Sequence, residues 1–152
     1  GLRVSELVRL KPHHIESDAD RMMIRVDQGK GKKDRYTILS HKLLADLRSY
    51  WSKYRPGKWL FAGQKPQTYL CEGAAQTVFY RAKKKAGLTK GPGIHSLRHT
   101  FATHALYQGT DLYNLKRFLG HSALKSTIIY NHLLPERLQQ CKSPQETLYE
   151  DD

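Results

Sequence analysis

The segment "HSLRHTFATH", residues 95–104, combines imidazole and guanidinium groups at a spacing that suits two different kinds of chemistry. His95 and His99 are four residues apart, so on a helix both could bind one metal ion. His95 and Arg98 are three residues apart, so on the same helix both could instead hold a phosphate group. The remainder of the sequence has to distinguish a metal site from a phosphate site.

A metal-dependent hydrolase is the weaker alternative. The zinc-binding pattern with histidines four residues apart also needs a glutamate directly after the first histidine, and Ser96 stands there. Asp111 is the only carboxylate between Gly73 and Leu134, although hydrolytic metal sites usually recruit carboxylates. We therefore expect neither a metal nor another cofactor.

The overall charge favours a polyanionic partner. With 26 Lys and Arg against 14 Asp and Glu, the net charge is +12, and nucleic acid is the commonest polyanion in a cell. Much of the positive charge is concentrated in "GKGKKDR", residues 29–35, and "RAKKK", residues 81–85. Side chains in these clusters are predicted to contact DNA phosphates without reading base sequence; they are Lys32, Lys33, Arg35, Arg81, Lys83 and Lys84.

The apolar pattern predicts a mostly α-helical α+β domain with a small antiparallel three-stranded sheet. Strands are expected at 21–26 and 36–39, joined as a hairpin, with a third strand at 58–63. Helices are expected at 5–10, 41–54, 72–86, 96–107, 111–119 and 125–131, with a short helix and an acidic tail after Pro135. Two cysteines and no apolar run of about 18 residues fit a reduced, cytoplasmic protein that does not span a membrane.

Five short segments resemble the tyrosine recombinase (phage integrase) family in type and order, and look most like its Xer and phage-integrase branches. They are "GLRVSEL" at 1–7, "GKG" at 29–31, "HSLRHTFATH" at 95–104, "LGHS" at 119–122 and "STIIYNHL" at 126–133. Each segment alone is weak evidence, whereas five in order across residues 1–134 are specific. The resemblance implies the catalytic-domain fold of that family for residues 1–134, followed by a terminal helix and tail at 135–152.

The resemblance also implies a role for each matching residue. Arg3 and Arg98 would hold the non-bridging oxygens of the scissile phosphate, and Lys30 would protonate the departing 5′ oxygen. His95 would bind the phosphate and assist proton transfer, and His121 would donate a further hydrogen bond. Tyr130 would be the nucleophile that becomes joined to the 3′ phosphate. Glu6 would support these catalytic side chains.

The implied activity is site-specific cutting and rejoining of double-stranded DNA through a 3′-phosphotyrosine intermediate, without metal or ATP. Relatives carry further helices and a separate domain ahead of the position of Arg3, so we expect this chain to be part of a longer protein that forms a homo-tetramer on DNA. Two alternatives stay open: a type IB topoisomerase-like strand transferase and a non-catalytic DNA-binding remnant. The target site and the biological task are not determined by the sequence.

Overall fold

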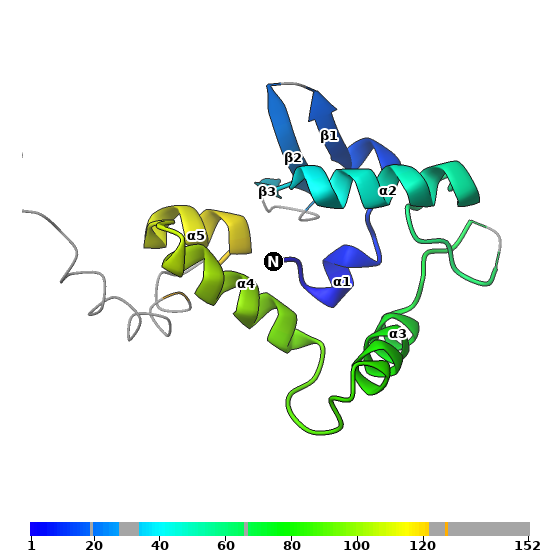
Figure 1. Ribbon diagram of the computed structural model, residues 1–152. Helices are drawn as coiled ribbons and strands as arrows, with labels where there is room; N and C mark the ends of the chain where they lie inside the picture. The colour runs from blue at the N-terminus through cyan, green and yellow to red at the C-terminus, as the bar shows by residue number, and fades with distance from the viewer. Residues whose placement is uncertain (19, 28–33, 66, 122–126, 128–152) are drawn as a thin grey trace, which may run out of the picture.

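The computed structural model describes residues 1–18, 20–27, 34–65, 67–121 and 127. Its helices and strands follow the order α1 (Val4–Leu7), a 3-10 helix η1 (Pro12–His14), β1 (Ile15–Asp18), β2 (Arg21–Val26), β3 (Arg35–Ile38), α2 (His41–Tyr54), α3 (Glu72–Lys85), α4 (His95–Tyr107) and α5 (Leu112–Leu119). In Figure 1, the N-terminus and α1 lie between the sheet with α2 above them and α3 with α4 below them. The predicted fold class, mostly helical with a small antiparallel sheet, is confirmed.

The sheet is antiparallel with the strand order β1-β2-β3. Val26 is opposite Arg35 and Ile24 is opposite Thr37, so these four side chains share one face of the β2–β3 hairpin. All four are buried, whereas the opposed pair Met23 and Ile38 on the other face is exposed. The face that carries Arg35 is therefore the one turned towards the interior.

The prediction for the third strand was wrong. Residues 58–63 form only an isolated bridge between Ala62 and Tyr69, and the third strand is β1. The Leu60 backbone N–H donates to the Leu10 carbonyl at 2.8 Å. This hydrogen bond joins residues 58–63 to the segment after α1 and not to the sheet. The first helix is also shorter than expected, ending at Leu7.

Local capping explains the ends of α2. The Ser40 hydroxyl accepts the Leu43 backbone N–H at 3.2 Å, as predicted for an N-cap, and Arg55 ends the helix in the left-handed conformation. Leu44 of this helix enters a core cluster built largely from distant loops and strands. The buried members of this cluster are Leu10, Ile24, Leu39, Leu44 and Leu60.

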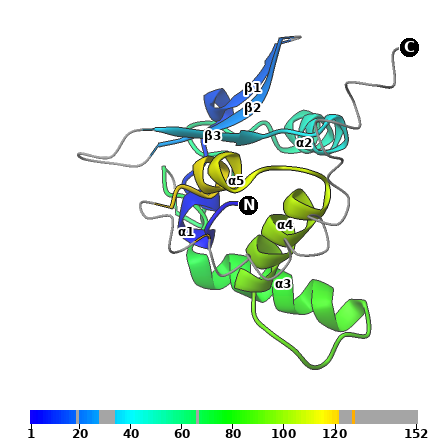
Figure 2. The ribbon, with the colours of Figure 1, turned by 90° about the vertical axis from the view of Figure 1, so that its left-hand side faces the viewer.

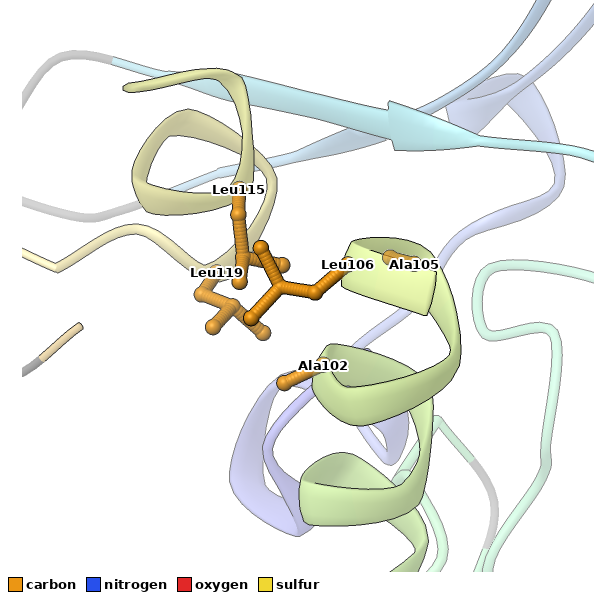
Figure 3. Packing of buried hydrophobic residues seen from close by; sticks show 5 residues of the cluster. All are labelled: Ala102, Ala105, Leu106, Leu115 and Leu119. Carbon is orange, nitrogen blue, oxygen red and sulfur yellow. The ribbon is translucent and has the colours of Figure 1, made fainter. Parts of the chain in front are cut away.

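A second core cluster joins α4 to α5. Ala102, Ala105 and Leu106 face Leu115 and Leu119, and all five are buried (Figure 3). The small alanines allow the two helices to approach closely, so the C-terminal end of α5 is held beside α4. Helix α5 also packs along β3 (Figure 2).

Helix α3 lies at the edge of this arrangement, with Ala75 as its only buried residue among those described. Gly87 follows it with a φ of 75°, the left-handed conformation predicted for its end. Within the described ranges, no helix combines the length and the apolar character that crossing a bilayer requires. The predicted helix at 125–131 and the segment after Pro135 lie outside the described residues, apart from Thr127.

Candidate phosphate-binding site

Glu6 is the acidic residue around which the site is organised. Arg3 is the N-cap of α1, and its backbone N–H donates to Glu6 Oε2 at 2.7 Å, the arrangement of a capping box. The Arg3 guanidinium donates from Nη1 to Glu6 Oε1 at 2.9 Å. One turn of helix therefore positions the predicted pair, with the Arg3 side chain still 40% exposed.

A second arginine reaches the same carboxylate from the sheet. Arg35 donates from Nη2 to Glu6 Oε2 at 2.8 Å, and its side chain is only 7% exposed. Burial by itself would raise the pKa of Glu6, but the Arg3 N–H and the two guanidinium groups outweigh it and lower that pKa. Glu6 is thus held as a carboxylate.

The third arginine comes from α4. Arg98 donates to the Gly1 carbonyl at 2.6 Å and to the Leu119 carbonyl at 2.5 Å, which fixes its guanidinium between the start of the chain and the end of α5. Its Nη1 lies 3.9 Å from Glu6 Oε2. The fold therefore brings together Arg3 and Arg98, the two arginines singled out by the sequence.

His121 adjoins this group at the end of α5. Gly120 has a φ of 64°, and the His121 N–H that follows donates to the Lys116 carbonyl at 3.2 Å, which turns the chain out of the helix. The ring Nδ1 lies 3.0 Å from the hydroxyl of buried Thr127. Burial lowers the pKa of His121, and the positive charges of Arg98, Arg3 and Arg35 lower it further, so the ring is neutral at pH 7.

The other predicted catalytic residues are placed in part or not at all. His95 is the first residue of α4, one helical turn before Arg98, and its side chain is exposed. Lys30 and Tyr130 lie outside the described residues. The structure thus assembles Arg3, Arg98 and His121 with the supporting Glu6.

The predicted DNA-contacting side chains have different surroundings. Arg81 and Lys84 are exposed on α3, whereas Lys83 donates from Nζ to the carbonyls of Gly91 and Pro92 at 3.0 and 3.2 Å. Arg35 was predicted among these surface contacts, and the structure instead buries it against Glu6. Lys32 and Lys33 lie outside the described residues.

A cavity of about 480 Å³ opens beside Arg3 and Glu6. Arg9, Lys11 and Trp59 line its other side, and the Lys11 ammonium lies over the Trp59 ring, 5.6 Å from its centre. The lining also includes the carboxylates of Glu6 and Asp27, and Asp27 Oδ2 lies 3.8 Å from Lys11 Nζ, so basic side chains exceed acidic ones by a single charge. No three His, Cys, Asp or Glu side chains in the described part of the chain are placed to share a metal ion.

The arrangement provides positive charge for a phosphodiester. Three guanidinium groups and one carboxylate have a formal charge of +2, and two of the arginines were expected there. Arginine donates parallel hydrogen bonds that match phosphate oxygens, and a positive site that is already assembled stabilises charge developing on those oxygens. The side chains present therefore offer positive charge and hydrogen-bond donors of the kind that phosphate oxygens accept.

Sequence reasoning missed the roles of two residues, Arg35 and Thr127. Arg35 is on the buried face of β3, and the alternation of "RYTIL" concealed this because the apolar Tyr36 and Ile38 occupy the other face. Thr127 had no signal beyond its place between His121 and Tyr130. Only the folded arrangement shows that its hydroxyl contacts the imidazole.

Known proteins are similar to this chain in sequence and in fold. The sequence profile of the Phage integrase family matches residues 1–137. The Sinorhizobium fredii protein y4qK, which has a provisional integrase/recombinase name, is 43% identical over 148 residues, covering 97% of this chain and 47% of that protein. Tyrosine recombinase XerD of Agrobacterium fabrum is 34% identical over 164 residues, covering 92% of this chain and 47% of XerD.

A solved structure of XerH site-specific recombinase, bound to a palindromic difH substrate after cleavage, matches with a TM-score of 0.76 and 28% identity. The match covers 95% of this chain and 42% of XerH. The chain thus spans about half the length of the curated relatives it matches, and the predicted tyrosine recombinase catalytic-domain fold is confirmed. Because the family profile covers nearly the whole sequence and the relatives agree with it, the chain belongs to the phage integrase family of tyrosine recombinases.

Proposed function

We propose that this chain is the strand-cleaving part of a site-specific DNA recombinase that uses a 3′-phosphotyrosine intermediate and needs neither metal nor ATP. The observation that carries the proposal is the convergence of Arg3 and Arg98 on Glu6, with His121 beside them. Family membership and the net charge of +12 support DNA as the partner.

Arg3 and Arg98 would bind the two non-bridging oxygens of the scissile phosphate. Arg98 is held by two backbone carbonyls, and Arg3 by Glu6, so little reorganisation is needed when phosphate enters. When Nδ1 of neutral His121 accepts the Thr127 hydroxyl hydrogen, the ring carries its own hydrogen on Nε2 and can donate it to phosphate.

The reaction would proceed by two balanced substitutions at phosphorus. In the first, the Tyr130 oxygen bonds to phosphorus as the bond to the 5′ oxygen breaks, Lys30 protonates that oxygen, and His95 assists removal of the phenol proton. In the second, a 5′-hydroxyl attacks the phosphotyrosine, and the phenol leaves with a proton. A phenol with a pKa near 10 needs a positive pocket to attack at neutral pH, and the arginines provide it.

The whole protein would act on duplex DNA as a homo-tetramer, as the family resemblance implies. The XerH structure, in which a recombinase is bound to its difH substrate, supports DNA binding through this fold. The charged surfaces available for it in the described residues include Arg81 and Lys84 on α3. These side chains would contact the phosphate backbone and contribute to affinity rather than to sequence selection.

Covalent capture tests the proposal without knowledge of the target site. The chain is incubated in EDTA with a library of nicked duplexes containing a randomised segment, and DNA that resists denaturing extraction is recovered and sequenced. We expect an enriched duplex that forms a protein–DNA adduct, loss of the adduct in Tyr130→Phe, and retention in Tyr113→Phe, whose side chain is 66% exposed.

Four outcomes would contradict the proposal. Capture of no DNA would favour a non-catalytic DNA-binding protein. An adduct that persists in Tyr130→Phe would place the nucleophile elsewhere, and cleavage abolished by EDTA would indicate metal-dependent hydrolysis. Relaxation of supercoiled plasmid without site preference would indicate a topoisomerase instead of a recombinase.

A further inference from the structure

We propose that Arg35 is a positioning residue: it fixes the Glu6 carboxylate, and Glu6 in turn fixes the Arg3 guanidinium for phosphate binding. The inference rests on the proposed function. It assigns a role to an arginine that the sequence grouped with the DNA-contacting surface.

Arg35 and the Arg3 guanidinium contact different oxygens of the Glu6 carboxylate. Glu6 Oε2 accepts from Arg35 at 2.8 Å and from the Arg3 backbone at 2.7 Å, which leaves Oε1 to accept from the Arg3 guanidinium at 2.9 Å. The carboxylate is therefore constrained on both oxygens. Without Arg35, the Glu6 side chain could rotate, and the direction of the Arg3 guanidinium would no longer be defined.

Exposure separates binding from positioning. The Arg3 side chain is 40% exposed and borders the cavity, whereas the Arg35 side chain is 7% exposed. A DNA phosphate can therefore approach Arg3, but Arg35 is covered. Arg35 therefore makes no direct contact with the substrate, and it orients Arg3 through Glu6.

Arg35 is part of the sheet. Arg35 begins β3, is paired in register with Val26 of β2, and belongs to the strand along which α5 packs. Glu6 is on α1, 29 residues earlier in the chain. The ion pair thus connects the strand that follows residues 28–33 to the helix turn that presents Arg3.

The energetics argue against a purely stabilising role. Within the described structure, Nε and Nη1 of Arg35 are buried and have no hydrogen-bond partner. Burying a guanidinium with unsatisfied donors costs free energy, and an apolar side chain commonly replaces a buried ion pair at no net cost. A positioning role explains why a charge occupies this place.

The charge of the site gives the proposal a measurable consequence. Arg35 keeps the Glu6–arginine group at a formal charge of +2 instead of +1. When the scissile phosphate is replaced by an uncharged methylphosphonate, the reaction depends less on the positive charge of the site and on the orientation of Arg3. Loss of Arg35 should therefore lower the rate of adduct formation less with that substrate than with the phosphate.

The test compares Arg35→Met and Arg35→Lys with the parent, using duplex recovered by covalent capture. Arg35→Met should lower the rate of adduct formation by about 10- to 100-fold, as expected for a residue that orients a functional side chain. DNA affinity should stay within about threefold, because the buried side chain does not touch DNA. Arg35→Lys should recover part of the rate, since a single donor, Nη2, contacts Glu6.

Arg25→Met is the matched control. Arg25 is on β2, opposite Tyr36 on the other face of the hairpin, and its Nε lies 3.4 Å from Asp27 Oδ1. Like Arg35, Arg25 is an arginine of the sheet whose guanidinium pairs with a carboxylate, but that carboxylate belongs to Asp27 and not to Glu6. Removal of Arg25 should leave the rate of adduct formation unchanged.

Two further readouts separate positioning from loss of fold. In a Glu6→Gln background, Arg35→Met should add little further loss, because both changes break one chain of contacts. With methylphosphonate duplex, the ratio of parent to Arg35→Met rates should fall towards one. Additive losses, or an equal deficit on both substrates, would overturn the proposal.

A titration of the Glu6 carboxyl by carbon-13 NMR requires no activity. In Arg35→Met the titration midpoint of Glu6 should lie at a higher pH than in the parent. In Arg25→Met the midpoint should be the same as in the parent. An unmoved midpoint would overturn the inference. If the parent captured no DNA, the proposed function would fail, and this titration would still decide whether Arg35 controls Glu6.

Discussion

Replacing Glu6 by glutamine should lower the free energy of unfolding by about 3 kcal/mol at pH 7. Removing one partner of a buried ion pair costs about 3–5 kcal/mol, because the other charge stays buried without compensation. Here the uncompensated charge is Arg35, which is 7% exposed, while Glu6 itself is 15% exposed. Arg3 is 40% exposed and screened by solvent, so its pair with Glu6 adds no more than about 1 kcal/mol.

The pH dependence of this effect has a defined sign. The folded protein lowers the pKa of Glu6 below its ordinary value of 4.5, so the unfolded chain binds the proton more readily. The stabilisation is complete above that ordinary value and is lost as the pH falls through the folded pKa. The stability gap between the parent and Glu6→Gln should therefore be constant above about pH 4.5 and narrow as the pH falls below that value.

Urea unfolding followed by far-ultraviolet circular dichroism measures both quantities. Glu16→Gln is the matched control, because Glu16 Oε2 lies 3.3 Å from Nε of Arg21, whose side chain is 59% exposed. That change should cost about 0.5 kcal/mol or less after solvent screening. A gap below about 1 kcal/mol for Glu6→Gln, or one that stays constant with pH, would refute the buried ion-pair argument.

Three other predictions follow from the described structure. Leu119→Ala should lower the free energy of unfolding by about 2–5 kcal/mol in a urea titration, whereas Leu97→Ala, at a position 58% exposed, should cost well under about 1 kcal/mol. Arg81→Ala should reduce the slope of log affinity against log salt by about 0.9 in fluorescence anisotropy with duplex DNA; an unchanged slope would remove Arg81 from the interface. Burial lowers the pKa of His14 despite the nearby Asp27 carboxylate, so His14 binds a proton more readily when unfolded. Parent stability should accordingly fall relative to His14→Gln as the pH drops below about 6.5, and parallel curves would contradict this sign.

The elements with strong local signals agree with their predictions. Ser40 caps α2, Asp111 accepts the backbone N–H groups of Tyr113 and Asn114 at the start of α5, and Gly120 ends that helix. Each signal acts within one helical turn, so neighbouring residues are sufficient to determine it. The predicted pairing of the two apolar runs is also present, because β2 and β3 are antiparallel neighbours in the sheet.

Tertiary packing decided what alternation alone could not. In β3 the residues on the buried face are Arg35 and Thr37, whereas the more apolar Tyr36 and Ile38 are on the other face. A shift of one residue in the pairing register moves every side chain of a strand to the opposite face of the sheet. A strand of four residues has too few apolar positions to determine which face is buried. Similarly, the third strand is β1 and not residues 58–63, because β1 ends at Asp18, close in the sequence to the start of β2 at Arg21, and needs no distant partner.

The sequence by itself determined the family, because the motifs that contain Arg3, Arg98 and His121 can be identified from the order and spacing of residues along the chain. It also determined the helix ends, which depend on adjacent residues. The tertiary structure alone decided that one carboxylate joins Arg3 to Arg35 and approaches Arg98, and that a buried threonine contacts His121. These contacts link α1, β3, α4 and the segment after α5, and their energy depends on burial, which exists only once the chain has folded.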